Sequence, residues 1–256
     1  MVPALSTISR SDEWQHFKAI VTDKYQLITI DWPGFGESDK IDIHYSGTVL
    51  QETLKKAIKV IQSKNNRKLT IIAAGHSASV VLTLKDKYIN TIKQVVLIAP
   101  TWRGPLPSMT GWSPKRLNII NEIVRLPIIG PILYFINTTK VIIRFMMKRH
   151  VWLNKNDLDN DKILRLQVLS RQKGARYASA AFVTGSLDID KNKKWWISNT
   201  KKIKEMSTLV IPKDSPKRSL SEMEALSESI KDVLYIRGRL GCHEEFGEEI
   251  AKRLFY

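Results

Sequence analysis

Short apolar runs rich in β-branched residues alternate with amphipathic segments along much of the chain. Five runs predict strands: Gln26–Trp32, Lys68–Ala74, Gln94–Pro100, Ser207–Pro212 and Asp232–Gly238. Because these runs are almost continuously apolar, they are typical of strands buried on both faces, as in a parallel sheet. Periodic apolar positions predict helices over Thr48–Gln62, Ser77–Lys87 and Glu245–Leu254. The alternation indicates βαβ units with right-handed crossovers.

The alternation stops between the third and fourth runs. Arg103–Glu205 is helical in pattern throughout, and its first third is broken by Pro105, Pro107, Pro114, Pro127 and Pro131. We interpret this segment as an insertion on the sheet and not as a second independent domain. The predicted organisation is therefore a core made of residues 1–102 and 206–256 with a helical insertion of residues 103–205.

The same insertion carries most of the excess positive charge. The net charge of the chain is +16, and Arg103–Glu205 holds 20 Lys and Arg against 7 Asp and Glu, a net of +13. A codon bias towards lysine is the simpler explanation, but bias alone would spread the charge evenly. Between Arg125 and Lys140 lie fourteen uncharged residues interrupted by prolines. This stretch is shorter than the roughly 20 residues of a spanning helix, so we expect it to be buried or interfacial.

Other bulk properties narrow the class of protein. With 256 residues, 43% of them hydrophobic and 26% charged, the chain has the composition of a globular domain with a sizeable core. The single cysteine, Cys242, has no partner for an internal disulfide. Met1–Arg10 lacks the basic and apolar regions of a secretory signal. We therefore expect a cytoplasmic location, which is compatible with peripheral contact with a membrane.

The strongest candidate site follows the second predicted strand, where Ile71–Val80 reads IIAAGHSASV. A strand that runs into Gly75–Ser79 and continues as a helix is close to the G-x-S-x-G turn of nucleophilic serines. Such a turn needs small residues beside the serine, and Ser79 stands where the second glycine usually is. Ser77 could instead be a simple helix N-cap. The strand before it and the helix after it favour a nucleophile whose oxyanion faces the helix N-terminus.

A second motif lies at the end of the first predicted strand. Asp31–Ser38 reads DWPGFGES and indicates a tight glycine turn. It lacks the third glycine of G-x-G-x-x-G and the lysine of a P-loop, which argues against a nucleotide site.

Together the two motifs resemble the α/β-hydrolase superfamily, in which D-x-P-G-x-G-x-S is followed by G-H-S-x-S. More narrowly, Pro3–Thr7, Ala99–Pro105 and Ala180–Gly185 are similar to a cyanobacterial and plastid-lineage branch of these hydrolases. The resemblance covers nearly the whole chain. It implies an α/β-hydrolase fold, with a mostly parallel central sheet flanked by helices and a helical lid insertion.

The resemblance also implies a triad in the order serine, acid, histidine. Asp214 follows the strand Ser207–Pro212 and is the acid candidate, with Asp188 and Asp190 as alternatives. His243 follows the last strand and precedes the final helix, so it is the candidate base, although a surface-loop histidine would also fit there. Glu244 beside it could simply form a salt bridge.

The remaining histidines fit a triad less well. His76 sits beside the serine and is expected to be structural, while His16, His44 and His150 fall outside the expected loops. In a triad, His243 would take the proton of Ser77 while Asp214 fixes the imidazole tautomer.

The backbone N–H groups of Ala78 and Leu5 are the candidates for the oxyanion hole. Leu5 lies where the family often carries H-G-x-P, and this chain reads Pro3-Ala4-Leu5-Ser6 instead. In the family, the loop at Pro3 follows a central strand. We therefore expect the N-terminal strands of the fold, including that central one, to be missing from these 256 residues.

These residues predict a serine hydrolase that cleaves an apolar carboxylic ester through an acyl-enzyme, without cofactor or metal. The alternative is a non-catalytic binding protein on the same scaffold, supported by Ser79 and the absent His-Gly. Epoxide hydrolase and dehalogenase chemistry is disfavoured because those relatives carry Asp where Ser77 stands. The expected partners are a small-molecule ester and an anionic membrane surface, but not nucleic acid, for which no motif is present. The oligomeric state is left open.

Overall fold

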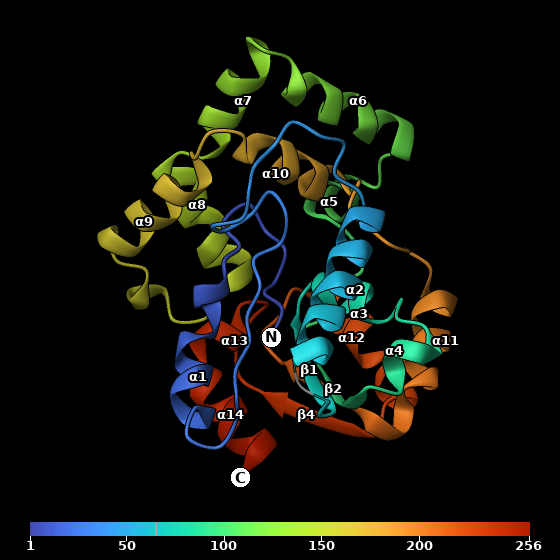
Figure 1. Ribbon diagram of the computed structural model, residues 1–256. Helices are drawn as coiled ribbons and strands as arrows, with labels where there is room; N and C mark the ends of the chain where they lie inside the picture. The colour runs from blue at the N-terminus through green and yellow to red at the C-terminus, as the bar shows by residue number, and fades with distance from the viewer. Residues whose placement is uncertain (65) are drawn as a thin grey trace.

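The computed structural model describes residues 1–64 and 66–256. In this part of the chain, the centre is a four-stranded parallel sheet in the order β1-β2-β3-β4 (Figure 1). The strands are β1 (Leu69–Ala74), β2 (Ile92–Ile98), β3 (Ser207–Pro212) and β4 (Asp232–Ile236). Every residue of β3 is buried, as its continuous apolar run requires. The predicted parallel sheet flanked by helices is confirmed.

One predicted strand is wrong. Gln26–Trp32 is not assigned to any strand, and beside β1 only Val2 forms an isolated parallel bridge, with Ala73. Val2 N–H donates to the Ile72 carbonyl over 2.8 Å, and Ala74 N–H donates to the Val2 carbonyl over 3.2 Å. A strand needs a neighbouring ladder for its backbone groups, and a single bridge residue next to β1 provides none for Gln26–Trp32.

Helices cover both faces of the sheet. In Figure 1, α1 (Gln15–Val21), α13 (Cys242–Glu245) and α14 (Gly247–Phe255) lie on one side of the strands, and α1 packs against α14. On the other side lie α2 (Gly47–Lys64), α3 (Ser77–Val81), α4 (Asp86–Ile89) and α12 (Lys217–Glu224). The amphipathic pattern of α2 is confirmed, since Leu50, Leu54 and Ile58 are buried.

The helix predicted over Ser77–Lys87 is shorter than expected. It ends at Val81, and α4 begins at Asp86 after a break. The Thr83 hydroxyl donates to the Val80 carbonyl over 2.6 Å. Leu84 N–H bonds the Val81 carbonyl over 3.1 Å, three residues back. These local bonds tighten the last turn and end the helix.

Residues 103–205 are helical, as the prolines and apolar spacing indicated. The helices are α5 (Pro105–Thr110), α6 (Pro114–Arg125), α7 (Ile129–Asn137), α8 (Lys140–Met146), α9 (Asn160–Ser170), α10 (Ala175–Thr184) and α11 (Lys193–Lys202). α10 packs against α5, α6 and α7, and these four helices lie beyond one end of the sheet (Figure 1). α11 lies instead beside the sheet, where Trp196 stacks on Trp102 with ring centroids 5.4 Å apart.

Short helical turns complete the described elements. They are the 3₁₀ turns η1 (Ser11–Trp14), η3 (Lys155–Asp157), η4 (Lys204–Met206) and η5 (Ser227–Ser229), and the π-helical turn η2 (Met147–Val151). Among the described residues, no single helix has the length and apolar content to cross a bilayer. Only the bent pair α6–α7, with 103° between its two helices, meets those two criteria jointly.

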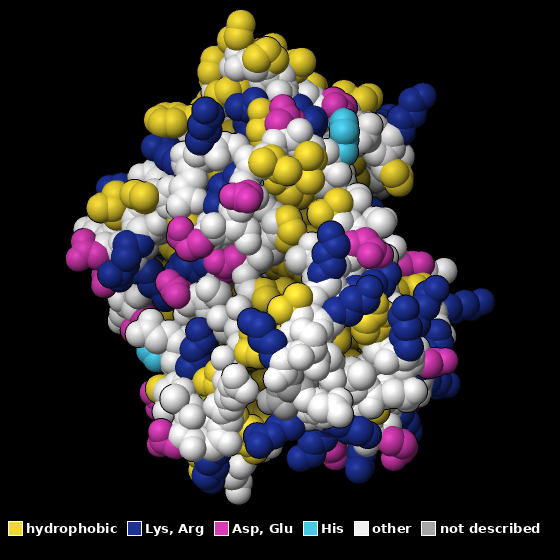
Figure 2. Space-filling model, in the orientation of Figure 1, with side chains coloured by type: hydrophobic (Ala, Val, Ile, Leu, Met, Phe, Trp, Pro, Cys, Tyr) yellow, Lys and Arg dark blue, Asp and Glu magenta, His cyan; other side chains and the backbone are white. Residues whose placement is uncertain are grey.

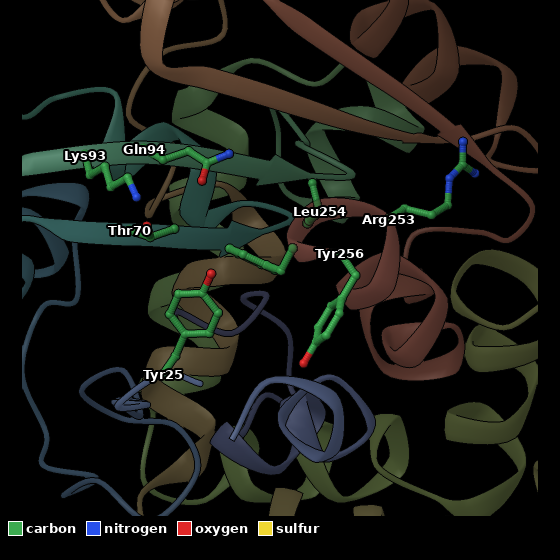
Figure 3. A pocket seen from close by; sticks show the side chains of 8 residues that line it. Tyr25, Thr70, Lys93, Gln94, Arg253, Leu254 and Tyr256 are labelled. Carbon is green, nitrogen blue, oxygen red and sulfur yellow. The ribbon is translucent and has the colours of Figure 1, made fainter. Parts of the chain in front are cut away.

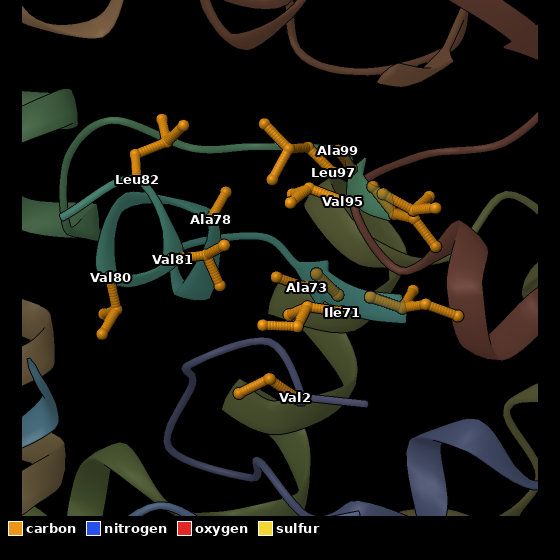
Figure 4. Packing of buried hydrophobic residues seen from close by; sticks show 14 of the residues in the cluster. Val2, Ile71, Ala73, Ala78, Val80, Val81, Leu82, Val95, Leu97 and Ala99 are labelled. Carbon is orange, nitrogen blue, oxygen red and sulfur yellow. The ribbon is translucent and has the colours of Figure 1, made fainter. Parts of the chain in front are cut away.

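Two hydrophobic cores hold these elements together. The main core surrounds the sheet and includes the fully buried Trp14, Trp32 and Trp196. Figure 4 shows Val2 beside Ile71 and Ala73 of β1, so the start of the chain is part of this core. A smaller core joins α8, η2 and α9 through Ile143, Met147, Trp152, Leu158, Ile163 and Leu166. The predicted fold class thus follows from burial of the apolar runs.

The turn from β1 into α3 depends on Gly75. Its φ is +54°, and an added Cβ would lie 3.1 Å from the Cβ of Ala4. Among the described non-glycine residues only Ala99 has a positive φ. The left-handed residue of this turn is therefore Gly75 and not Ser77, and the loop at Ala4 packs directly against it.

Gly75→Ala is expected to lower the free energy of unfolding by about 1–3 kcal/mol, because alanine would combine left-handed strain with the contact to Ala4. Gly111→Ala is the matched control, since Gly111 has a φ of +65° and nothing within 4 Å of its added Cβ. The control should lose only about 1 kcal/mol. Urea unfolding of both variants measures the difference. Equal losses would mean that the approach of Ala4 contributes nothing.

Candidate functional site

Ser77 lies at the start of α3, directly after the carboxyl end of β1. Carboxyl ends of parallel strands are where open α/β sheets hold their ligands. Ser79, which replaces the usual second glycine, is buried, and its hydroxyl donates to the His76 carbonyl over 2.9 Å. A serine at this position therefore fits the turn because it is small and its polar group is satisfied within the turn.

The Ser77 hydroxyl is fully buried and has two partners. It donates to the Pro3 carbonyl over 2.5 Å and accepts from Trp32 Nε1 over 2.8 Å. Trp32 comes from the DWPGFGES motif, which thus contributes to the serine site and not to a phosphate loop. Since the single hydroxyl proton is engaged with Pro3, the structure represents a closed arrangement in which Ser77 must first release that carbonyl to react.

His243 is also buried, and its partner is a carboxylate that the sequence analysis did not identify. His243 Nε2 lies 2.8 Å from Glu13 Oε2, while its Nδ1 has no hydrogen-bond partner among the described residues. The ring of Trp14 lies 5.2 Å from the His243 ring, centroid to centroid, and covers it. The carboxylate at the candidate base is therefore Glu13 of η1, far from Asp214 in the sequence.

Backbone groups hold the Glu13 carboxylate in place. Ala4 N–H donates to Oε2 over 3.1 Å, and Arg10 N–H donates to Oε1 over 3.2 Å. Burial raises the pKa of Glu13 above its ordinary value, and the hydrogen bond and charge of His243 act in the opposite direction. A carboxyl group with a raised pKa, next to a buried imidazole, is typical of functional sites as well as of structural ion pairs.

A single peptide group connects the serine to this pair. The carbonyl of the Pro3–Ala4 peptide accepts from Ser77, and the N–H of the same peptide donates to Glu13. Glu13 in turn bonds His243. Ser77 and His243 are thus linked through one peptide group and one carboxylate, and no direct hydrogen bond joins them among the described residues.

Asp214 lies at the carboxyl ends of β3 and β4, but its carboxylate faces the backbone. Asp214 Oδ2 accepts from Gly238 N–H over 2.9 Å, and Asp214 N–H donates to the Gly238 carbonyl over 3.0 Å. The side chain is exposed and makes no hydrogen bond to His243 in the described structure. In this arrangement Asp214 ties the ends of the two strands together.

The alternative acids have other partners. Asp188 Oδ1 lies 3.0 Å from His76 Nε2, with both side chains buried, and Asp188 Oδ2 lies 3.1 Å from Lys191 Nζ. Asp190 caps the N–H of Asn192. Glu244 forms ion pairs with Arg10 and Lys162. The pairing of His76 with Asp188 agrees with the structural role expected of that histidine.

The other histidines lie away from Ser77 in the described contacts. His16 is exposed, and His44 Nδ1 lies 3.8 Å from Glu122 Oε1 near the surface. Burial, followed by Arg149 and Arg239, lowers the pKa of His150. None of the three has a described contact with Ser77.

The two candidate oxyanion donors differ in their present bonds. Ala78 N–H makes a long 3.3 Å bond to the Gly75 carbonyl. Leu5 is buried, and its N–H has no hydrogen-bond partner among the described residues. The described contacts therefore give the Leu5 N–H, two residues from the Ser77 acceptor Pro3, no competing acceptor.

Two hollows lie away from Ser77 in the described structure. One cavity of about 350 Å³ is lined by Tyr25, Arg253 and Tyr256 together with Thr70, Lys93 and Gln94 (Figure 3). These last three residues stand at the beginnings of β1 and β2, the opposite end of the strands from Ser77. A second hollow is lined by His16 and residues around α14. Among the described residues, no group of three or more His, Cys, Asp or Glu could hold a metal ion.

Glu13 and Trp32 are the site residues that the sequence analysis missed. Trp32 lies inside the DWPGFGES motif, and its neighbours in that motif were the only sequence signal for it. Glu13 belongs to Ser11–Trp14, a polar stretch with no periodic pattern. Its proximity to the loop at Pro3 was the only available indication.

Comparisons with known proteins bear on the fold of the chain. No family model matches the chain, and no curated protein matches it. Three solved structures are similar to it over most of its length. A serine hydrolase involved in carbazole degradation superposes with a TM-score of 0.70 at 16% identity, covering 98% of this chain and 86% of that one.

An esterase and an enol-lactonase are also similar to the chain. A thermophilic esterase from Thermogutta terrifontis has a TM-score of 0.64 at 16% identity, covering 95% of this chain and 83% of its own. The enol-lactonase from Burkholderia xenovorans LB400 has a TM-score of 0.67 at 12% identity, covering 99% and 88%. Identities this low show shared architecture and no more. The chain therefore has the α/β-hydrolase fold.

Proposed function

We propose that this protein is a serine hydrolase that cleaves carboxylic esters with apolar groups, with Ser77 as nucleophile and His243 as base. The observation that supports it most is the joining of Ser77 to a buried His243–Glu13 pair through the Pro3–Ala4 peptide. The solved structures with the same fold include a serine hydrolase, an esterase and an enol-lactonase.

The proposed reaction begins when Ser77 leaves the Pro3 carbonyl and turns towards His243. Its Oγ attacks the ester carbonyl carbon while His243 accepts the hydroxyl proton. The N–H groups of Ala78 and Leu5 stabilise the oxyanion. The intermediate then expels the alcohol, which takes its proton from His243. Water, activated by the same base, releases the carboxylic acid and restores Ser77.

The carboxylate that orients His243 is Glu13 in this proposal, and Asp214 is the competing candidate. Glu13 already bonds His243, is held by two backbone N–H groups, and lies in the same loop region as the oxyanion candidate Leu5. Asp214 would have to leave Gly238 to take that role. With Glu13 as the acid, the order along this chain would be acid, serine, histidine, whereas the family order is serine, acid, histidine.

The insertion of residues 103–205 is proposed as the lid above the site, with residues 1–102 and 206–256 as the core. Ala178 of α10 packs against Gly34 in the DWPGFGES motif, whose Trp32 bonds Ser77. Asp188 of the same insertion bonds Gly104 N–H and pairs with His76, the neighbour of Ser77. A displacement of the insertion would therefore reach the serine through both contacts.

A non-catalytic binding protein on the same scaffold is the second candidate. It is favoured by the complete burial of Ser77 and by the bonds that occupy its hydroxyl. The two candidates differ in one property: only the hydrolase acylates Ser77.

Ser77→Ala is expected to abolish labelling by a fluorophosphonate probe and to lower turnover of a short nitrophenyl ester by about 1,000-fold or more. Ser79→Ala is the matched control, because Ser79 lies in the same turn, is equally buried and bonds only His76. The control should label like the parent. Labelling of the Ser77 variant would disprove the nucleophile, and an unlabelled, folded parent would favour the binding protein.

Glu13→Gln and Asp214→Asn form a pair that identifies the orienting acid, with His243→Ala as the reference for loss of the base. We expect Glu13→Gln to lower kcat by about 100-fold or more with little change in KM, and to alter the acid limb of the pH profile. Glu13→Asp should recover part of the activity. Asp214→Asn should change kcat much less. A severe effect confined to Asp214→Asn would assign the role to Asp214.

The raised pKa of Glu13 also predicts a pH dependence of stability. The folded protein holds this proton more tightly than the unfolded chain, so the contribution of the group is full at low pH. It is lost as the pH rises from the ordinary glutamate pKa through the raised one. Glu13→Gln removes this titration. As the pH rises over that range, the free energy of unfolding of the parent should therefore fall relative to that of the variant. Urea unfolding between about pH 4 and 7 measures it, and a constant difference would contradict the raised pKa.

A further inference from the structure

The surface of α7 and its neighbours is unusually apolar. Ile128, Ile129, Ile132, Phe135, Ile136 and Val141 are between 51% and 78% exposed, and we call these six residues the apolar apex. Figure 2 shows hydrophobic side chains gathered over the end of the molecule that carries α7. Scattered exposed side chains are ordinary, but a contiguous apolar surface marks an interaction site.

The helix geometry explains why these residues stay exposed. α7 buries only Gly130 of its nine residues and packs against α6 and α10 through a narrow side. Ile129, Ile132 and Ile136 follow the spacing of a helical stripe, and that stripe has no protein covering it. The apolar face of α7, which in a core helix would be buried, is exposed to solvent here.

Cations outnumber acidic residues in the chain around the apolar apex, where the acidic Asp42 and Glu122 both lie against Arg125 of α6. Between Glu122 and Asp157 the chain has six Lys and Arg and no Asp or Glu. Arg125 is paired with Asp42, but Lys140, Arg144, Lys148, Arg149 and Lys155 form no ion pair among the described residues. Arg171 adds a cation 3.8 Å from the centre of the Phe135 ring. Such a surface fits an apolar layer bordered by negative charge.

The dimensions limit how the apolar apex can meet a bilayer. α7 has nine residues and is therefore about 14 Å long, whereas the hydrocarbon core is about 30 Å thick. The 103° bend between α6 and α7 prevents the pair from forming one straight segment. The fitting geometry is insertion into one leaflet with the cations at the level of the headgroups.

A second copy of the chain fits this surface less well. A symmetric contact would place the same patch of each copy against the other. The cations Lys140 and Arg144 of α8 would then face their own equivalents, with no acidic residue between Glu122 and Asp157 to separate them. An anionic lipid surface supplies both the apolar phase and the countercharge.

We propose that the apolar apex inserts into one leaflet of an anionic membrane and that the surrounding cations bind the lipid headgroups. This role belongs to the surface of α6–α8 and does not depend on the activity of Ser77. The positive charge of the insertion would then bind an anionic phospholipid bilayer.

Vesicle co-sedimentation tests the proposal with the full chain. Vesicles of phosphatidylcholine with phosphatidylglycerol should bind the protein at least about tenfold better than phosphatidylcholine alone, and added salt should weaken that binding. The double variant Ile132→Asp with Phe135→Asp should lose at least about tenfold in binding. Val60→Asp is the control, because Val60 of α2 is 55% exposed outside the apolar apex.

The cations have their own matched variants. Lys140→Gln with Arg144→Gln, both in α8 next to Val141, should weaken binding to anionic vesicles, while Lys56→Gln with Lys59→Gln, two exposed lysines of α2, should not. Insertion itself can be observed with an environment-sensitive dye attached to Ile132→Cys. The native Cys242 is buried and does not compete for the label. Emission should shift to the blue with anionic vesicles at Ile132→Cys but not at Val60→Cys.

Three results would overturn the proposal. Equal binding of parent and Ile132→Asp/Phe135→Asp would show that the apolar apex is not the contact. Equal binding to neutral and anionic vesicles, or none, would remove the role of charge. A concentration-dependent dimer that the apex variants dissolve, together with no vesicle binding, would assign the surface to a second copy.

Discussion

The Pro3–Ala4 peptide is the group on which the candidate site depends. Its carbonyl oxygen accepts the Ser77 proton, and its N–H supports Glu13, which bonds His243. Three segments far apart in the sequence are thus held at one point by a single planar unit. Ala4 also limits the turn at Gly75, so the position of this loop sets both the shape of the turn and the state of its serine. Movement of this peptide would remove one partner of Ser77 and one partner of Glu13 at the same time.

Burial makes this arrangement both specific and sensitive. A buried carboxylate without partners is costly, and Glu13 has two backbone donors and an imidazole. The pair of His76 and Asp188 repeats the same principle on the other side of Ser77, with Lys191 and Gly104 as further partners of Asp188. Each pair joins the neighbourhood of the serine to a different part of the chain. Removing one partner of either pair would leave a buried polar group without its partner and so disturb the surroundings of the serine.

The basic insertion uses its residues in two ways. Positions of α9 and α10 such as Ile163, Leu166 and Ala178 are buried, whereas the apolar positions of α7 face outwards. The stretch between Arg125 and Lys140, which was expected to be buried or interfacial, contains α7, and most of its apolar side chains are exposed. The difference between these helices follows from packing, because α10 packs against α5, α6 and α7, whereas α7 buries only Gly130.

The sequence by itself determined the parallel sheet, because continuous apolar runs such as Ser207–Pro212 can be satisfied only by burial on both faces. It also determined the turn at Gly75–Ser79, where local chemistry requires small residues. Only the tertiary structure decided that Gln26–Trp32 forms no strand, because a ladder needs a neighbour that local sequence does not specify. It likewise decided that His243 meets Glu13 while Asp214 meets Gly238. Which carboxylate reaches an imidazole depends on the packing of distant segments, and that information is carried by no single stretch of the chain.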